Sequence, residues 1–222
     1  MNHPAHPRAA NRMVVGISGA TGIAYGIRAL QALGAAGIET HLVMSRSARL
    51  TLAYESDLTV AQVQELADFH YSPEDVGAPV ASGSFRTRGM IVAPCSMKSL
   101  AQIAVGTCDT LLARAADVTL KERNRLVLMV RETPLTLTHL RNMTTVTENG
   151  GIVAPPVPAF YTRPAGLQDV IDQSVGRVLD LFGIDTGAFP RWGEAAPPAG
   201  ATTADGTAAV TTRQLDKSAI HV

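Results

Sequence analysis

Short runs of β-branched and apolar residues alternate along the chain with longer stretches in which apolar residues recur at helical spacing. The short runs predict strands at residues 13–17, 40–44, 90–93, 126–130 and 152–154. The longer stretches predict helices, one of them capped by Ser96, at about 24–33, 96–105, 136–149 and 167–181. This alternation is typical of an α/β fold in which helices cover a mainly parallel sheet. The order of the strands in that sheet stays open.

The two ends differ from the segment between them. Residues 1–12 are rich in Pro, His and Asn, and residues 195–222 are dominated by Ala, Thr, Gly and Pro with almost no large apolar side chain. Such segments bury too little apolar surface to offset the conformational entropy that is lost on ordering. We therefore expect one domain over residues 13–194, between a flexible N-terminal tail and a disordered C-terminal tail.

Charge and cysteine content argue against several kinds of partner. Lys plus Arg and Asp plus Glu are 19 each, so no basic excess indicates binding to nucleic acid or to an anionic membrane. The chain shows no apolar stretch of signal-peptide length near its start, and nowhere about 18 consecutive apolar residues. Cys95 and Cys108 form no CxxC pair, and the 6 histidines share no metal-ligand spacing. We expect a cytoplasmic protein without a disulfide framework and without a metal site.

Two segments with small and hydroxyl-bearing residues follow predicted strands. The first, GISGATG at 16–22, joins a strand to a helix, where backbone N–H groups can approach a phosphate. Its spacing is GxxGxxG and not GxGxxG, so a ligand loop and a tight structural turn are both open. The second, APCSMKS at 93–99, lies at the carboxyl end of a strand, where open parallel sheets bind ligands. No neighbouring base would activate Cys95, which favours a buried thiol over a nucleophile.

Charged and aromatic residues mark the later segments. Arg131 and Glu132 end a predicted strand, where a cation can meet phosphate and a carboxylate can move a proton; a structural ion pair is the alternative. The proline-rich stretch at 155–161 ends in Tyr161, which together with Arg177 could clamp an anion. Trp192, the only tryptophan, either docks the tail by burial or offers a π-face to a ligand.

Taken together and in this order, the motifs resemble the flavin prenyltransferase family of the UbiX type, whose members accompany UbiD-type decarboxylases. The resemblance runs from about residue 13 to 192 and is carried by GISGATG, the serine of HLVMSRSAR, YESD, APCSMKSLA, RAADVTLKERNRLVLMVRETPL and PPVPAFY. It implies a Rossmann-like three-layer sandwich that binds FMN and dimethylallyl phosphate. It also implies a homododecamer with active sites where subunits meet, and a product that passes to a UbiD-type decarboxylase.

The resemblance also implies a role for individual residues. Flavin-binding positions match Gly19, Ala20, Thr21, Ser45, Ser96, Met97, Lys98, Ser99 and Arg131. Positions that hold the prenyl phosphate match Arg114, Lys121, Tyr161 and Arg177, with Lys121 expected from a neighbouring subunit. Catalytic positions match Thr21, Glu55, Glu132 and Trp192. Thr21 departs from the serine that many relatives carry, but it keeps the hydroxyl.

In the reaction that the resemblance implies, N5 of reduced FMN displaces phosphate from the prenyl carbon and C6 then closes a fourth ring, without a metal. Glu132 would transfer protons with Thr21 as relay, and Trp192 would face the prenyl cation. Two alternatives are a flavin-dependent cysteine decarboxylase and a non-catalytic FMN-binding subunit. The PxMNxxM motif of the first is absent. The second would not need a further anion site around Lys121, Tyr161 and Arg177.

Overall fold

A computed structural model describes residues 11–187, 189 and 191 of the chain. Residues 11–187 and 189 belong to one compact unit, which contains the helices and strands, and Arg191 belongs to a second. Residues 1–10 and 192–222, on which most of the two expected tails and Trp192 fall, lie outside the described residues.

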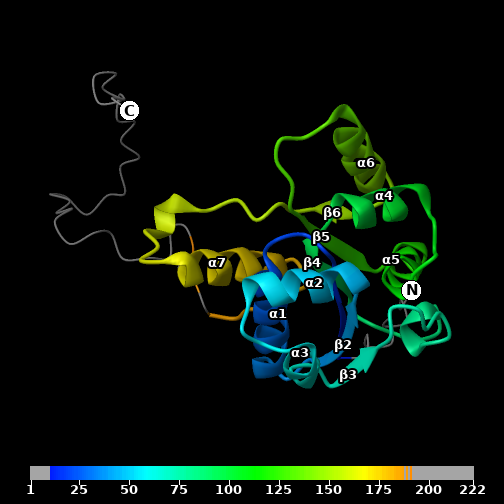
Figure 1. Cartoon of the computed structure of the whole chain (residues 1–222), viewed down its shortest axis with the longest axis horizontal. Coiled ribbons are helices and arrows are strands. Elements are labelled where there is room, and N and C mark those ends of the chain that lie inside the picture. Colours follow the sequence, from blue (N-terminus) through cyan, green and yellow to red (C-terminus); the bar gives the residue numbers. More distant parts are fainter. Residues whose placement is uncertain (1–10, 188, 190, 192–222) are drawn as a thin grey trace, which may run out of the picture. The chain divides into compact units, whose positions relative to one another are not determined.

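The centre of the first unit is a parallel sheet (Figure 1). Its strands are β1 (Arg12–Ile17), β2 (Glu39–Met44), β3 (Phe69–Tyr71), β4 (Gly89–Cys95), β5 (Arg125–Val130) and β6 (Ile152–Val153). They lie in the order β3-β2-β1-β4-β5-β6. The chain therefore moves one way from β1 to β3 and the other way from β4 to β6, and the direction switches between β1 and β4. Ligands of open α/β sheets bind in the crevice at the carboxyl ends of the strands on either side of such a switch.

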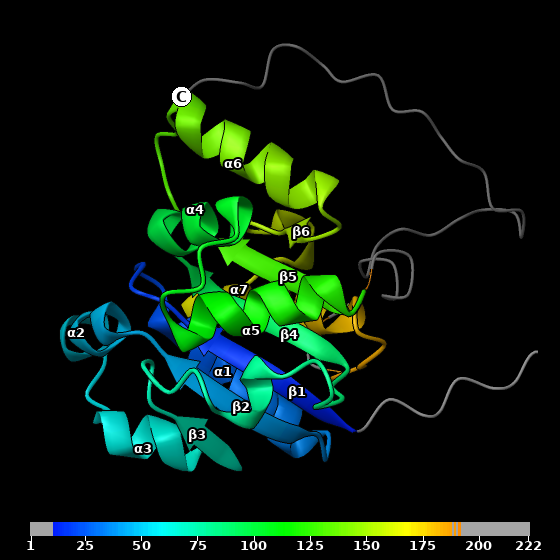
Figure 2. The same cartoon turned by 90° about the vertical axis from the view of Figure 1, so that its right-hand side faces the viewer.

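Helices cover both faces of the sheet, as the two views show (Figures 1 and 2). They are α1 (Ile23–Ala35), α2 (Arg46–Glu55), α3 (Val60–Glu65), α4 (Met97–Val105), α5 (Leu111–Lys121), α6 (Leu137–Glu148) and α7 (Leu167–Asp180), with short 3₁₀ turns η1 (Pro79–Ala81) and η2 (Phe160–Thr162). The strands and helices predicted from the apolar pattern are all present, and the α/β sandwich is confirmed. Short β3 and the helices α2, α3 and α5 were not predicted.

Alternate residues of β1 enter two separate cores, because successive side chains of a strand point to opposite faces. Met13, Val15 and Ile17 pack with α1, α2, α3 and α7 on one face. Val14 packs with α4, α5 and α6 on the other. Burial on both faces explains why the strands read as continuous apolar runs. Among the described residues, no helix is both long and apolar enough to cross a membrane.

Candidate functional site

The turns after β1, β2 and β4 are tied together at the carboxyl edge of the sheet. The hydroxyl of Ser18, which is fully buried, donates to the carbonyl of Pro94 at 2.9 Å and accepts from the backbone N–H of Ser96 at 2.7 Å. The N–H of Ser45 donates to the carbonyl of Ile17 at 2.9 Å. These bonds bring the two small-residue segments singled out in the sequence side by side at the switch point.

Three capped helix N-termini converge on one pocket at this edge. Ser45 caps α2, Ser96 caps α4 and Thr110 caps α5, each through its hydroxyl, which accepts the N–H three residues further along at 3.1, 3.3 and 3.3 Å respectively. The pocket measures about 570 Å³ and is lined by Ser45, Arg46, Ser47, Leu50, Pro73, Glu74, Ser96, Lys98, Ser99, Gln102, Asp109, Thr110 and Leu112. Helix N-termini present backbone N–H groups and a partial positive charge, so they attract anions. With Lys98 on the wall, the pocket suits a phosphate-bearing ligand.

Gly19 lets the β1–α1 turn lie against the start of α2. A Cβ at this position would lie 2.4 Å from both Cβ and Oγ of Ser47, closer than side chains approach one another. The neighbouring Ala20 is buried. Small residues in this turn therefore have a packing reason, and they also bring backbone close to the pocket.

Glu55, the last residue of α2, caps α1. The N-cap of α1 is Gly22 at φ 100°, which provides no side-chain cap. Instead the Glu55 carboxylate accepts the N–H groups of Gly22 at 2.8 Å and Ile23 at 2.9 Å. Burial raises the pKa of Glu55, but hydrogen bonds from the Thr21 hydroxyl and these two N–H groups, together with the charge of Arg131, outweigh it and hold the pKa below its ordinary value. The acid is therefore an anion at neutral pH.

Arg131 lies close enough to the start of α1 to affect two groups there. Its charge helps lower the pKa of Glu55. It also opposes, without cancelling, the effect of burial that raises the pKa of Tyr25. Thr21, Glu55 and Arg131 thus form a polar cluster beside the β1–α1 turn, although the last two come from distant parts of the chain.

Glu132 is exposed at the end of β5, where its carboxylate accepts the N–H of Thr133 at 3.0 Å. None of the ion pairs within the described residues joins it to Arg131, so the sequence-based alternative of a structural ion pair finds no counterpart there. The acid is free to meet a ligand from solvent.

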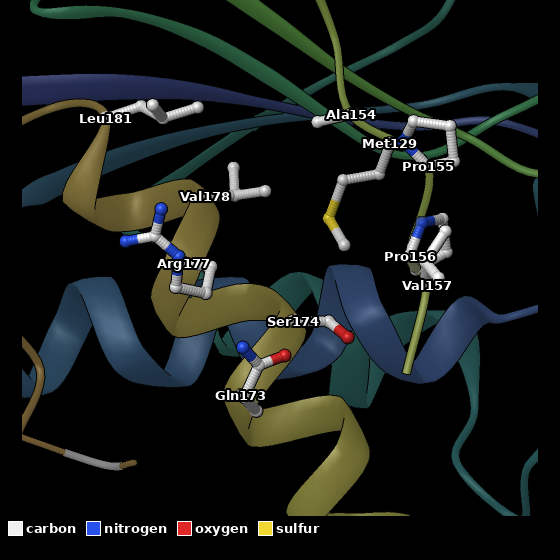
Figure 3. A pocket seen from close by; sticks show the side chains of 10 residues that line it. All are labelled: Met129, Ala154, Pro155, Pro156, Val157, Gln173, Ser174, Arg177, Val178 and Leu181. Carbon is white, nitrogen blue, oxygen red and sulfur yellow. The ribbon is translucent and has the colours of Figure 1, made fainter. Parts of the chain in front are cut away.

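A second, smaller pocket of about 220 Å³ lies between α7 and the chain that leaves β6 (Figure 3). Gln173, Ser174 and Arg177 line it from α7, and the prolines after β6 line it from the other side. The guanidinium of Arg177 donates to Asp180 at 2.9 Å. Tyr161, in η2, is about half exposed and does not line this pocket.

Arg114 and Lys121, like several other predicted residues, line neither pocket. Arg114 donates to the carbonyl of Ala81 at 3.3 Å and to Asp117 at 2.9 Å. Lys121 ends α5, next to the start of β5 and hence at the amino edge of the sheet, where it pairs with Glu122. The 11 residues of α5 span roughly 16 Å between the first pocket and Lys121. Within one subunit, none of the hydrogen bonds or ion pairs of the described residues joins Lys121 to another candidate.

The side chain of Cys95 is fully buried, and burial raises its pKa to about 12. A thiol in that state is neither a nucleophile nor a metal ligand at neutral pH. The interpretation of Cys95 as a buried structural thiol is confirmed. Met97, next to the Ser96 cap, is partly buried against the core on the α4–α6 face.

Comparison with known proteins identifies the family. The family model described as Flavoprotein matches residues 1–179. The chain is 57% identical over 181 residues to flavin prenyltransferase UbiX of Thauera aromatica, covering 82% of this chain and 93% of that protein. The chain belongs to the UbiX family of flavin prenyltransferases.

Solved structures of the UbiX family share the fold. The crystal structure of AnUbiX (PadA1) in complex with FMN and dimethylallyl pyrophosphate has a TM-score of 0.81 at 57% identity, covering 82% of this chain and 96% of that one. A dodecameric FMN-dependent UbiX-like decarboxylase from Escherichia coli O157:H7 has a TM-score of 0.80 at 48% identity, covering 82% and 98%.

Ser18, Arg46 and Glu74 were not among the residues predicted from the sequence. Ser18 lies inside the glycine-rich segment, but nothing local indicates that its hydroxyl joins two loops 76 residues apart. Arg46 follows the predicted Ser45 directly, which is a signal that could have been used. Glu74 lies in the loop after the unpredicted β3, so its place in the pocket needed the fold.

Proposed function

We propose that this protein is a flavin prenyltransferase that joins a dimethylallyl group from dimethylallyl phosphate to N5 and C6 of reduced FMN. The observation that carries the proposal is the pocket at the sheet's switch point, where three capped helix N-termini meet, in a chain of the UbiX family. The UbiX-family structure that holds FMN and dimethylallyl pyrophosphate supports the same assignment.

The pocket fits a flavin mononucleotide in size and chemistry. Its volume of about 570 Å³ lies within the range usual for small-molecule sites. The three N-termini and Lys98 would hold the phosphate. Gly19, Ala20 and Thr21 would border the ring system together with Ser96, Met97, Ser99 and Arg131. Reduced FMN, when bound, supplies the nucleophilic ring atoms to which the prenyl carbons become attached.

The other predicted residues divide between proton transfer and charge stabilisation. Thr21, which is hydrogen-bonded to the ionised Glu55, would act as the proton relay for Glu132. Glu132, exposed at the end of β5, would exchange a proton at the flavin or at the leaving phosphate. Allylic C–O cleavage leaves negative charge on the phosphate, and Arg114, Tyr161 and Arg177 would stabilise it. Trp192 would offer its π-face to the prenyl group.

Lys121 would complete the donor site from a neighbouring subunit. It lies at the opposite edge of the sheet from the flavin pocket, too far along α5 to reach it within one chain. In a homo-oligomer, Lys121 of one subunit can reach the pocket of another. We propose a dodecamer like the one named for the relative from Escherichia coli. We place the reaction in the cytoplasm and propose that a UbiD-type decarboxylase receives the product.

The decisive experiment is anaerobic incubation of the purified protein with reduced FMN and dimethylallyl phosphate, followed by mass analysis of the extracted flavin. We expect the flavin to gain one five-carbon prenyl unit, and heat-denatured protein serves as the control. Dimethylallyl pyrophosphate, run in parallel, determines which donor is used. A flavin of unchanged mass with both donors, despite FMN binding, would leave the protein as a non-catalytic FMN-binding subunit.

A further inference from the structure

An ion pair lies in the lining of the large pocket. Arg46 is the first residue of α2, and Glu74 lies in the loop that follows β3; both line the pocket. Nε of Arg46 lies 2.5 Å from Oε1 of Glu74, while the Ser72 hydroxyl donates to Oε2 at 2.6 Å. The hydrogen bonds from Ser72 and Arg46 and the arginine's charge lower the pKa of Glu74, against the opposing effect of desolvation. Glu74 is thus an anion that pairs with the guanidinium at the wall of the pocket.

This ion pair is weak enough to exchange partners. The Arg46 side chain is 81% exposed and that of Glu74 51% exposed. Pairs this exposed contribute little to stability, because water and salt screen them. A phosphate group is a stronger partner, since it carries more charge and accepts the two parallel N–H bonds of a guanidinium. An anion that enters between the three N-termini would therefore draw Arg46 away from Glu74.

We propose that Arg46 is a ligand of the flavin phosphate and that Glu74 is a competing anion, which pairs with the guanidinium until the phosphate takes its place. The inference rests on the proposed function, because it takes FMN as the occupant of this pocket. It makes Arg46 a residue by which the protein selects FMN over riboflavin, which has the same ring system without the phosphate. The alternative is a brace that only fastens α2 to the loop after β3.

The test compares FMN with riboflavin as probes, by quenching of flavin fluorescence at low salt. Arg46→Gln should weaken FMN binding by roughly tenfold, the loss expected for one charge-assisted contact at an exposed site, and leave riboflavin binding within about twofold. Arg49→Gln is the matched control, because Arg49 is exposed on the same helix but does not line the pocket. Glu74→Gln removes the competing anion and should tighten FMN binding by about two- to threefold while riboflavin again stays unchanged.

The outcomes separate this inference from the proposed function. If the wild type prefers FMN and Arg46→Gln keeps that preference, the role of Arg46 is overturned and the flavin pocket survives. If both variants bind FMN and riboflavin more weakly by the same factor and have lower melting temperatures, the pair is only a structural brace. That result also overturns the inference. A wild type that binds neither flavin overturns the inference and the proposed function together.

Discussion

Replacing Glu55 should destabilise the protein through a specific pair of hydrogen bonds. Its carboxylate accepts from Gly22 at 2.8 Å and from Ile23 at 2.9 Å, at a helix start that has no other side-chain cap. Loss of an N-cap typically costs about 0.5–2 kcal/mol, and here two donors and a favourable charge at a helix N-terminus are lost together. We therefore expect Glu55→Ala to lower the free energy of unfolding by about 1–2 kcal/mol, or the melting temperature by roughly 2–8 °C.

The stability that Glu55 contributes should depend on pH in a direction that its pKa determines. The pKa of Glu55 in the folded protein lies below its ordinary value of 4.5. A group of this kind contributes stability that is complete above the unfolded pKa and disappears as the pH falls through the folded pKa. The stability difference between wild type and Glu55→Gln, which keeps an acceptor but not the charge, should therefore be constant above about pH 6 and shrink below pH 4.5.

Urea unfolding at pH 7 and at pH 4, followed by circular dichroism, measures both effects. Glu148→Ala is the control, because Glu148 is exposed at the end of α6 and should behave as an ordinary surface residue. A Glu55→Ala protein within about 0.5 kcal/mol of wild type would refute the capping argument. So would a difference between wild type and Glu55→Gln that grows toward acid pH.

The fold could be predicted largely because both faces of its central strands are buried. Because their side chains are buried on both faces, the strands β1, β2, β4 and β5 are mostly apolar in sequence. This distinguishes them from the amphipathic helices between them. Edge strand β3 has only 3 residues, Phe69–Tyr71, of which the first two are exposed, so it has no such run. Helix α5 was missed for another reason. Its charged residues drew attention as candidate ligands, although its buried positions and the Thr110 cap carried a helix signal.

The segments that form the site could be predicted from the sequence, but the contacts between them could not. The two segments at 16–22 and 93–99 were identified from small residues after strands, whereas their meeting depends on β1 lying next to β4, and strand order is a property of the whole sheet. Glu55 illustrates the same limit, since it meets Gly22 across 33 residues through the packing of α2 on α1. Resemblance assigned Glu55 to an active site, while the geometry adds that it caps a helix.

The remaining predictions concern reactivity and turnover. In the native protein a thiol reagent at pH 8 should modify Cys108 but not Cys95, whose pKa is about 12. In the denatured protein the reagent should modify both cysteines, and mass spectrometry measures the modification in each case. Prenylation should proceed at the same rate within about twofold in EDTA and in Mg²⁺, because the reaction that the family resemblance implies uses no metal. Glu132→Gln should slow prenylation by roughly 10² to 10⁴ in single-turnover measurements at saturating substrates and leave FMN affinity intact. The amide keeps the shape of the side chain and its contact with the N–H of Thr133 but cannot exchange a proton, so a purely structural Glu132 would give near-normal turnover. Lys121→Ala separates the two kinds of defect, because removing a phosphate ligand should chiefly raise the donor concentration needed for half-maximal rate. A near-normal rate for Glu132→Gln at saturation would therefore remove this carboxylate from the chemistry, whatever happens to Lys121→Ala.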